Sequence, residues 1–105
     1  MAKKVKMKAK EKRQPEKLLA KVPAQYVFYC RDGSVFADLR ELVEGLRAMS
    51  NETFAYHSNL QKQDFSNWVR DVIGDEELAN DLAKASSKLQ AAEYLVAKIA
   101  LFTSK

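Results

Sequence analysis

The chain has 105 residues, 47% of them hydrophobic and 30% charged, which is enough apolar material for one packed domain and excludes a fully disordered protein. Its single cysteine excludes an internal disulfide framework and indicates a reducing compartment. The formal net charge of +4 is distributed unevenly: residues 1–21 contain nine Lys or Arg and two Glu, whereas residues 22–105 contain nine basic and twelve acidic side chains. We therefore expect two parts, a flexible Lys-rich tail over residues 1–22 and a small helical domain over residues 23–105.

The fold class that we expect is mainly α, with about four helices and a short N-terminal strand or hairpin. No long apolar run follows the basic start, and the most apolar stretch, YLVAKIALF, has half the length of a membrane span. We therefore expect a soluble, cytoplasmic protein with no membrane partner.

In the tail, lysine alternates with small or apolar residues from Lys4 to Lys10, and an extended backbone would place these lysines along one edge. Such a row can follow the phosphate backbone of RNA, DNA or the ribosome without reading sequence. The same composition is typical of a tail that only keeps a protein in solution, and both interpretations stay open. The candidate nucleic-acid-binding residues are Lys3, Lys4, Lys6, Lys8, Lys10, Lys12 and Arg13.

The segment QYVFYC, residues 25–30, is rich in aromatic and β-branched residues and lies between Pro23 and the turn signal RDG. It predicts a short strand that pairs through the turn with Val35 and Phe36. Single-stranded-RNA modules use such aromatics to stack bases, but their four-stranded sheet has no counterpart in this pattern. The aromatic residues that we interpret as core are Tyr26, Phe28 and Tyr29.

The stretch SVFADLRELVEGLRAM places apolar residues at helical spacing, with Ser34 or Asp38 as its N-cap. Gly45 in its middle costs a helix about 1 kcal/mol relative to alanine, so it predicts a close helix crossing. A short helix, NETFAYHS, follows and begins after Ser50 or Asn51 as its cap. The apolar positions of the first helix are Phe36, Leu39, Leu42, Val43, Leu46 and Met49.

After Asp64, the stretch FSNWVRDVIG has the clearest amphipathic pattern of the chain. Gly74 followed by Asp75 predicts the end of that helix and the N-cap of the next, EELANDLAKA. A last helix begins near Ser87 and Gln90, which have capping-box spacing.

The last helix is apolar almost all round, because only Glu93 and Lys98 are charged between residues 91 and 102. Such a helix is either central in a fold or presents a second face to a protein partner or a second copy of the chain. The candidate interface residues are Leu95, Ile99 and Phe102.

A polar connection from the end of the expected helix NETFAYHS to the stretch FSNWVRDVIG, here called the elbow, contains the only histidine, His57. Its polar side chains, with Asn59 and Asp64, most simply cap helix ends and close the turn, and a ligand-binding surface is the alternative. A nucleophile pair of Cys30 and His57 is conceivable on residue types alone, but nothing around Cys30 indicates an activated thiolate. Zinc sites need clustered N and S ligands, which one His and one Cys at distant positions do not provide, so we expect no metal. We also expect no cofactor, no catalytic residue and no enzyme activity.

The segments GSVFADLRELVEGLRAMSNETFAYH and QDFSNWVRDVIGDEELANDL resemble a small domain of unknown function found mainly in archaea, sometimes fused to larger proteins. The resemblance covers residues 25–85 and implies a shared fold that carries no known activity. Gln63 departs from the family pattern, which has asparagine there. The matching residues are Met49, Ser50, Phe54, Tyr56, His57, Asp64, Phe65, Trp68, Val69, Asp75, Leu78 and Ala79. The signature residues, to which we assign a structural role, are Tyr56, His57, Asp64, Phe65 and Trp68.

The uneven charge predicts a non-enzymatic accessory protein whose tail contacts nucleic acid or a ribonucleoprotein without sequence specificity. The alternative is a protein–protein adaptor or a homodimer that acts through the apolar last helix, with a tail that is only solubilising.

Overall fold

The computed structural model describes residues 18–103, and these form a mainly helical domain with an N-terminal hairpin, which confirms the expected fold class. Within those residues five α-helices are present rather than about four. No helix of residues 18–103 has both the length and the apolar character that crossing a membrane requires. The elements in chain order are the 3-10 turn η2 (Ala24–Tyr26), the strands β1 (Phe28–Tyr29) and β2 (Val35–Phe36), the helices α2 (Leu39–Ala48), α3 (Asn51–His57) and α4 (Asp64–Trp68), the π-helical turn η3 (Val69–Ile73), and the helices α5 (Glu76–Lys84) and α6 (Lys88–Thr103).

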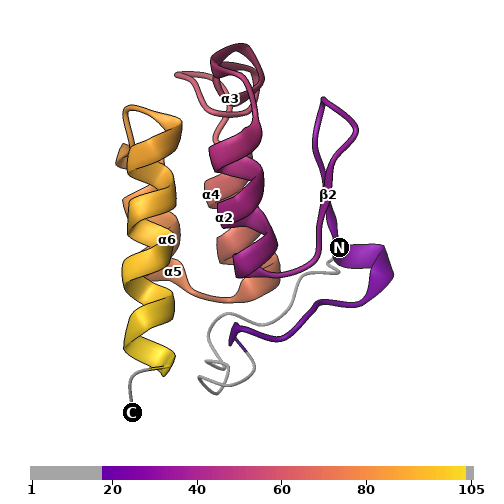
Figure 1. Ribbon diagram of the computed structural model, residues 1–105, viewed down its shortest axis with the longest axis vertical. Coiled ribbons are helices and arrows are strands. Elements are labelled where there is room, and N and C mark those ends of the chain that lie inside the picture. The colour runs from indigo at the N-terminus through magenta and orange to yellow at the C-terminus, as the bar shows by residue number, and fades with distance from the viewer. Residues whose placement is uncertain (1–17, 104–105) are drawn as a thin grey trace.

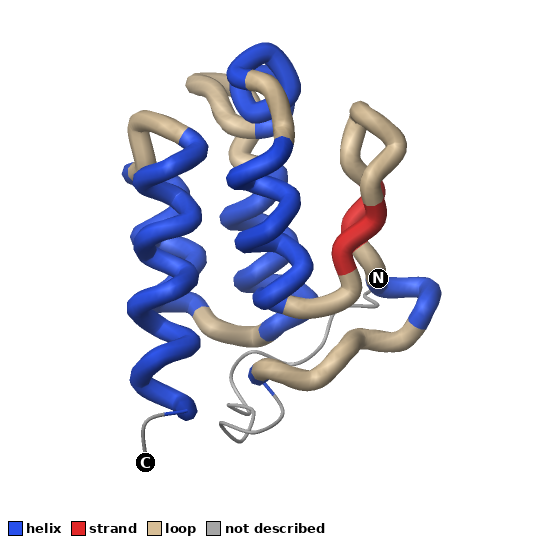
Figure 2. Tube along the Cα trace, in the orientation of Figure 1, coloured by secondary structure: helices blue, strands red, loops and turns tan. Residues whose placement is uncertain are grey.

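Helix α2 stands in the middle of the domain, with α6 along one side and the hairpin along the other, while α4 and α5 lie behind (Figure 1). Figure 2 shows how little of the fold is strand, so the hairpin depends on the helices for its stability. The largest fully buried apolar side chains come from α2, η3, α5 and α6: Leu39, Leu42, Leu46, Val69, Ile73, Leu78 and Leu95.

The expected hairpin is present, with Phe28 opposite Phe36 and Tyr29 opposite Val35. The first two residues of the predicted strand, Gln25 and Tyr26, however, belong to η2. Because successive side chains of a strand point to opposite faces, Phe28 and Phe36 enter the core, whereas Tyr29 is 71% exposed. The interpretation of Tyr29 as a core residue is therefore wrong, while Tyr26 packs against the core from its edge.

Helix α2 begins one residue after Asp38, whose side chain accepts a 2.7 Å hydrogen bond from the Glu41 N–H. Phe36 fits the helical spacing but lies in β2, because the cap stops the helix short of it. A Cβ added to Gly45 would lie 2.2 Å from Cζ of Phe36. The glycine therefore makes room for an aromatic ring of the hairpin, and not for the expected helix crossing.

The stretch predicted as one helix after Asp64 is α-helical only to Trp68 and continues as the π-helical turn η3. Gly74, with a positive φ of 91°, ends it, and the N–H of Gly74 donates to the Val69 carbonyl at 2.8 Å. The side chain of Asp75 then accepts from the Leu78 N–H at 3.0 Å. The predicted stop and the predicted cap of α5 are both confirmed.

The packed domain reaches back to Leu18, before the boundary expected at residue 23. Leu18 and Val22 are 7% and 6% exposed and belong to the core. The Val22 N–H also donates to the Ala37 carbonyl at 2.8 Å, which ties this segment to the end of β2. Leu18 and Val22, which we expected to belong to the tail, therefore pack into the core of the domain.

Candidate functional site

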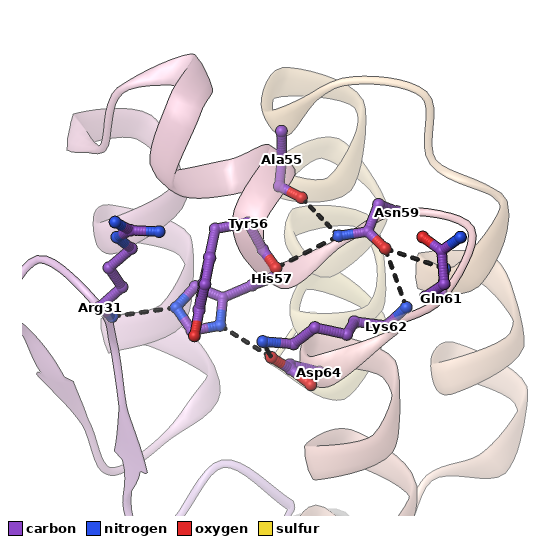
Figure 3. A network of polar contacts seen from close by, with 8 residues as sticks. All are labelled: Arg31, Ala55, Tyr56, His57, Asn59, Gln61, Lys62 and Asp64. Atoms are coloured by element: carbon purple, nitrogen blue, oxygen red, sulfur yellow. Dashed lines mark hydrogen bonds and ion pairs between the residues drawn. The ribbon is translucent and has the colours of Figure 1, made fainter.

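The elbow between α3 and α4 is closed by the side chain of Asn59 (Figure 3). Its carbonyl oxygen accepts from the backbone N–H groups of Gln61 and Lys62 at 2.9 and 3.0 Å. Its amide nitrogen donates to the Ala55 carbonyl at 2.8 Å, at the end of α3. One asparagine therefore satisfies both the C-terminal carbonyl of a helix and two amides of the turn that follows.

His57, at the end of α3, joins three segments of the chain. Its Nδ1 lies 2.9 Å from Oδ2 of Asp64, and its Nε2 accepts a 2.9 Å hydrogen bond from the backbone N–H of Arg31 in the hairpin turn. A nitrogen that accepts carries no proton, so the network assigns a neutral imidazole with its proton on Nδ1. The residue is only 5% exposed. His57 is therefore a buried link between the hairpin and the elbow.

Aromatic rings surround this imidazole on the core side. The ring centroids of Phe28 and Phe65 lie 5.2 and 5.3 Å from that of His57, and 5.0 Å from each other. Trp68 meets Phe28 edge-on at 6.0 Å, and its indole N–H donates to the Tyr26 carbonyl at 2.7 Å. Four of the five signature residues are thus brought together in one polar and aromatic junction.

The fifth signature residue, Tyr56, lies on the outer side of the elbow and is 43% exposed. The Arg31 guanidinium carbon lies 4.4 Å from its ring centroid, and the Lys62 ammonium lies 3.7 Å from it. Lys62 also pairs with Asp64 at 3.3 Å. Sequence reasoning missed Arg31 and Lys62, because no periodic pattern connects a hairpin turn to a helix 25 residues further along the chain.

The nucleophile pair considered from residue types does not form. Cys30 is buried, and burial raises the pKa of its thiol, which disfavours the reactive thiolate. Both ring nitrogens of His57 are already engaged, with Asp64 and with the Arg31 N–H. Within residues 18–103, no group of three His, Cys, Asp or Glu side chains could hold a metal ion. Every buried side-chain N or O atom in that range has a hydrogen-bond partner.

The candidate nucleic-acid-binding residues of the tail lie outside the described residues; they are Lys3, Lys4, Lys6, Lys8, Lys10, Lys12 and Arg13. Lys21, the first basic residue that the structure describes, pairs with Glu41 and, at 3.3 Å, with Asp38. The hydrogen bond that Lys21 donates to the Glu41 carboxylate raises the pKa of Lys21, and the same bond lowers the pKa of Glu41. This lysine is thus held against the start of α2.

The candidate interface residues of α6 face the domain itself. Leu95 is fully buried, so it is not available to a partner in this fold. Ile99 and Phe102 are partly buried and pack against the core. The apolar side chains that α6 does expose are Leu89, Val96 and Leu101, at 58%, 40% and 63%.

A groove of about 330 Å³ runs along the exposed side of α6. Arg47, near the end of α2, borders the groove together with the negatively charged Glu93 and with apolar residues of α6. The residues that line it are Arg47, Leu89, Ala92, Glu93, Val96 and Ala97.

No family model, curated protein or solved structure matches this chain. The resemblance to a mainly archaeal domain of unknown function therefore stays a prediction that rests on the signature residues alone.

Proposed function

We propose that this protein is a non-enzymatic accessory protein whose basic N-terminal segment contacts nucleic acid or a ribonucleoprotein without reading its sequence. The observation that carries the proposal is the separation of charge. Residues 1–17 contain eight Lys or Arg and two Glu, whereas residues 18–103 contain nine basic and twelve acidic side chains. A segment of this density neutralises backbone phosphates and releases their counterions, which favours binding to any phosphate polymer.

Two features of the described domain support this division of roles. Lys21 is paired with two carboxylates, so the excess positive charge belongs to the residues before it. The buried polar groups of the elbow satisfy one another, which fits a structural junction better than a catalytic centre. The domain then provides a stable body from which the basic segment acts.

The test is a salt series of binding to RNA and to duplex DNA with the full chain and with a variant in which Lys4, Lys6, Lys8 and Lys10 are replaced by alanine. Each phosphate contact contributes roughly −0.9 to the slope of log K against log salt on duplex DNA. If each of the four lysines makes one phosphate contact, the variant should lose about 3.6 units of slope on duplex DNA. A control with Arg40→Ala and Lys84→Ala removes exposed charges of the domain. Absence of binding at low salt, or an equal loss in the control, would contradict the proposal.

A second candidate function, self-association through α6, is favoured by its exposed apolar side chains and the groove beside them. The groove combines apolar side chains, Leu89 and Val96, with opposite charges, Glu93 and Arg47. In a two-fold dimer the same surface of each chain meets the other, so the proposed arrangement would cover the exposed apolar side chains of both copies.

Leu89→Glu and Val96→Glu test this dimer, because both side chains are exposed and a charge there leaves the core intact. Leu101→Glu is the matched control, since Leu101 is exposed on the same helix but does not line the groove. Sedimentation at about 1 M salt, where the Debye length is roughly 3 Å, leaves apolar association in place. A dimer lost only in the two groove variants supports the arrangement, whereas a monomer at every concentration contradicts it.

A further inference from the structure

The outer face of the elbow carries two cations on one aromatic ring. Figure 3 shows Tyr56 edge-on, with Arg31 on one side of the ring and Lys62 on the other. The guanidinium carbon and the ammonium nitrogen lie 4.4 and 3.7 Å from the ring centroid. The three residues come from the hairpin turn, α3 and the elbow, and only the folded chain brings them together.

The backbone beneath both cations is anchored. The Arg31 N–H donates to Nε2 of the buried His57, and the Lys62 N–H donates to the side chain of Asn59. The ring between them belongs to α3. The two charges are therefore held near each other by hydrogen bonds and by cation–π attraction, so a ligand that binds both has little left to order.

Of the two cations, only Lys62 has an ion-pair partner among residues 18–103. Asp64 lies 3.3 Å from Lys62 and also receives the His57 ring N–H. The carboxylate of Asp32, next to Arg31 in the turn, accepts from the Ser34 N–H. The Arg31 side chain contacts the Tyr56 ring and meets no carboxylate of the described residues within ion-pair distance. The two nearby carboxylates balance the formal charge of the pair, but the guanidinium donors of Arg31 are left for an anionic ligand.

The geometry also decides which part of a nucleic acid fits. Stacking of a base requires an uncovered ring face, and a cation lies over each face of Tyr56 in Figure 3. What the cluster offers instead is guanidinium and ammonium donors with the phenol hydroxyl beside them, and these groups bind phosphate oxygens.

We propose that Arg31, Tyr56 and Lys62 form a second phosphate contact, on the domain itself, which takes a backbone phosphate of the same polymer that the basic segment holds. The inference rests on the proposed function, since it assigns that function a second point of contact. Two separate contacts on one strand raise the overall affinity through effective concentration, although each is weak.

The test uses the full chain and short oligonucleotides of thymidine, of adenosine and of abasic backbone. With Arg31→Gln and Lys62→Gln together, we expect the salt slope to fall by roughly 0.7 units, as for one phosphate contact on a single strand, and the affinity at moderate salt to fall about tenfold. The exchange Arg31→Lys with Lys62→Arg keeps both charges and should restore most of the binding. Because no base stacks on Tyr56, the three oligonucleotides should bind with similar affinity.

A local readout separates binding from a merely structural role. In ¹H–¹⁵N spectra of the full chain, the Arg31 amide and the Arg31 side-chain Nε–H should shift on addition of the thymidine oligonucleotide. They should still shift, at higher ligand concentration, when Lys4, Lys6, Lys8 and Lys10 are replaced by alanine.

The controls distinguish the two proposals. Arg40→Gln with Lys84→Gln removes the same charge elsewhere, and an equal loss of affinity in this control overturns the site at Arg31 and Lys62. Loss of binding only in the variant of the basic segment supports the proposed function and also overturns this site. A strong preference for adenosine over the abasic strand contradicts the assignment to phosphate.

Discussion

Replacement of His57 by alanine tests whether the elbow is a structural junction. The imidazole is 5% exposed, lies against Phe28 and Phe65, and holds the hairpin turn by accepting from the Arg31 N–H at 2.9 Å. An exposed or ligand-binding histidine would be dispensable for folding. A buried link of this kind is not.

The expected cost follows from the contacts that are lost. Truncation of a large buried side chain to alanine costs about 2–4 kcal/mol, because it removes packing and leaves a cavity. The Arg31 N–H loses its acceptor, which adds about 1 kcal/mol. Asp64 is 30% exposed at its side chain, so water replaces the ring N–H at little cost. The free energy of unfolding should therefore fall by about 3–5 kcal/mol, and the melting temperature by roughly 15 °C or more.

Asp64→Asn is the matched control, because an amide oxygen accepts the Nδ1–H of a neutral imidazole as a carboxylate does. It also removes the partly exposed pair with Lys62, which contributes only about 0.5 kcal/mol. We therefore expect a loss below about 1 kcal/mol in urea unfolding. Side-chain ¹⁵N spectra of His57 should show a proton on Nδ1 and none on Nε2.

Two results would refute the reasoning. If His57→Ala lowers the free energy of unfolding by less than about 1 kcal/mol, the ring does not join the hairpin to the elbow, and a ligand-binding role becomes the better interpretation. If Asp64→Asn is as damaging as His57→Ala, the contact is an ion pair and the assigned tautomer is wrong.

Gly45→Ala should lower the free energy of unfolding by about 1 kcal/mol, because the added Cβ would meet the buried ring of Phe36. In most helix interiors the same change stabilises by about that amount. Adding Phe36→Leu to the Gly45→Ala chain should recover most of the loss in urea unfolding. Cys30 should react slowly with a thiol reagent in the folded protein, because its side chain is buried and burial raises the pKa of its thiol. Rapid labelling of the folded protein at neutral pH would contradict this. Hydrogen bonds from Lys21 and from a backbone N–H lower the pKa of Glu41. The carboxylate of Glu41 therefore contributes its full stabilisation at pH values above the ordinary pKa of 4.5, and this stabilisation is lost as the pH falls through the lower pKa of the folded state. Unfolding of Glu41→Gln should therefore differ most from the parent chain at neutral pH and converge with it in acid, and parallel pH curves would show that the carboxylate adds nothing.

Local signals in the sequence were sufficient for most of the secondary structure. Asp38, Ser50 and Asp75 each cap a helix with a side-chain oxygen, as expected of a short polar residue that precedes an apolar run. Gly74 ends η3 with the positive φ that glycine tolerates. These effects act over three or four residues, so a pattern in the sequence reveals them. The hairpin turn at Gly33 belongs to the same group.

Long-range packing decided the positions at which the sequence was misleading. Phe36 satisfies the helical period but enters the space beside Gly45 from β2, and Leu95 lies in the core although α6 is apolar on nearly every side. Tyr29 faces solvent because strand alternation places its neighbour Phe28 inward.

The candidate site shows the same division between local and tertiary information. The amino-acid sequence by itself determined that a polar elbow contains His57, that this elbow closes a turn, and that the positive charge is concentrated before the domain. Only the tertiary structure decided that His57 accepts from the Arg31 N–H and that Arg31 and Lys62 meet on Tyr56. The physical reason is that turn and cap hydrogen bonds join neighbours in the chain, whereas these contacts form only after the hairpin packs against the helices.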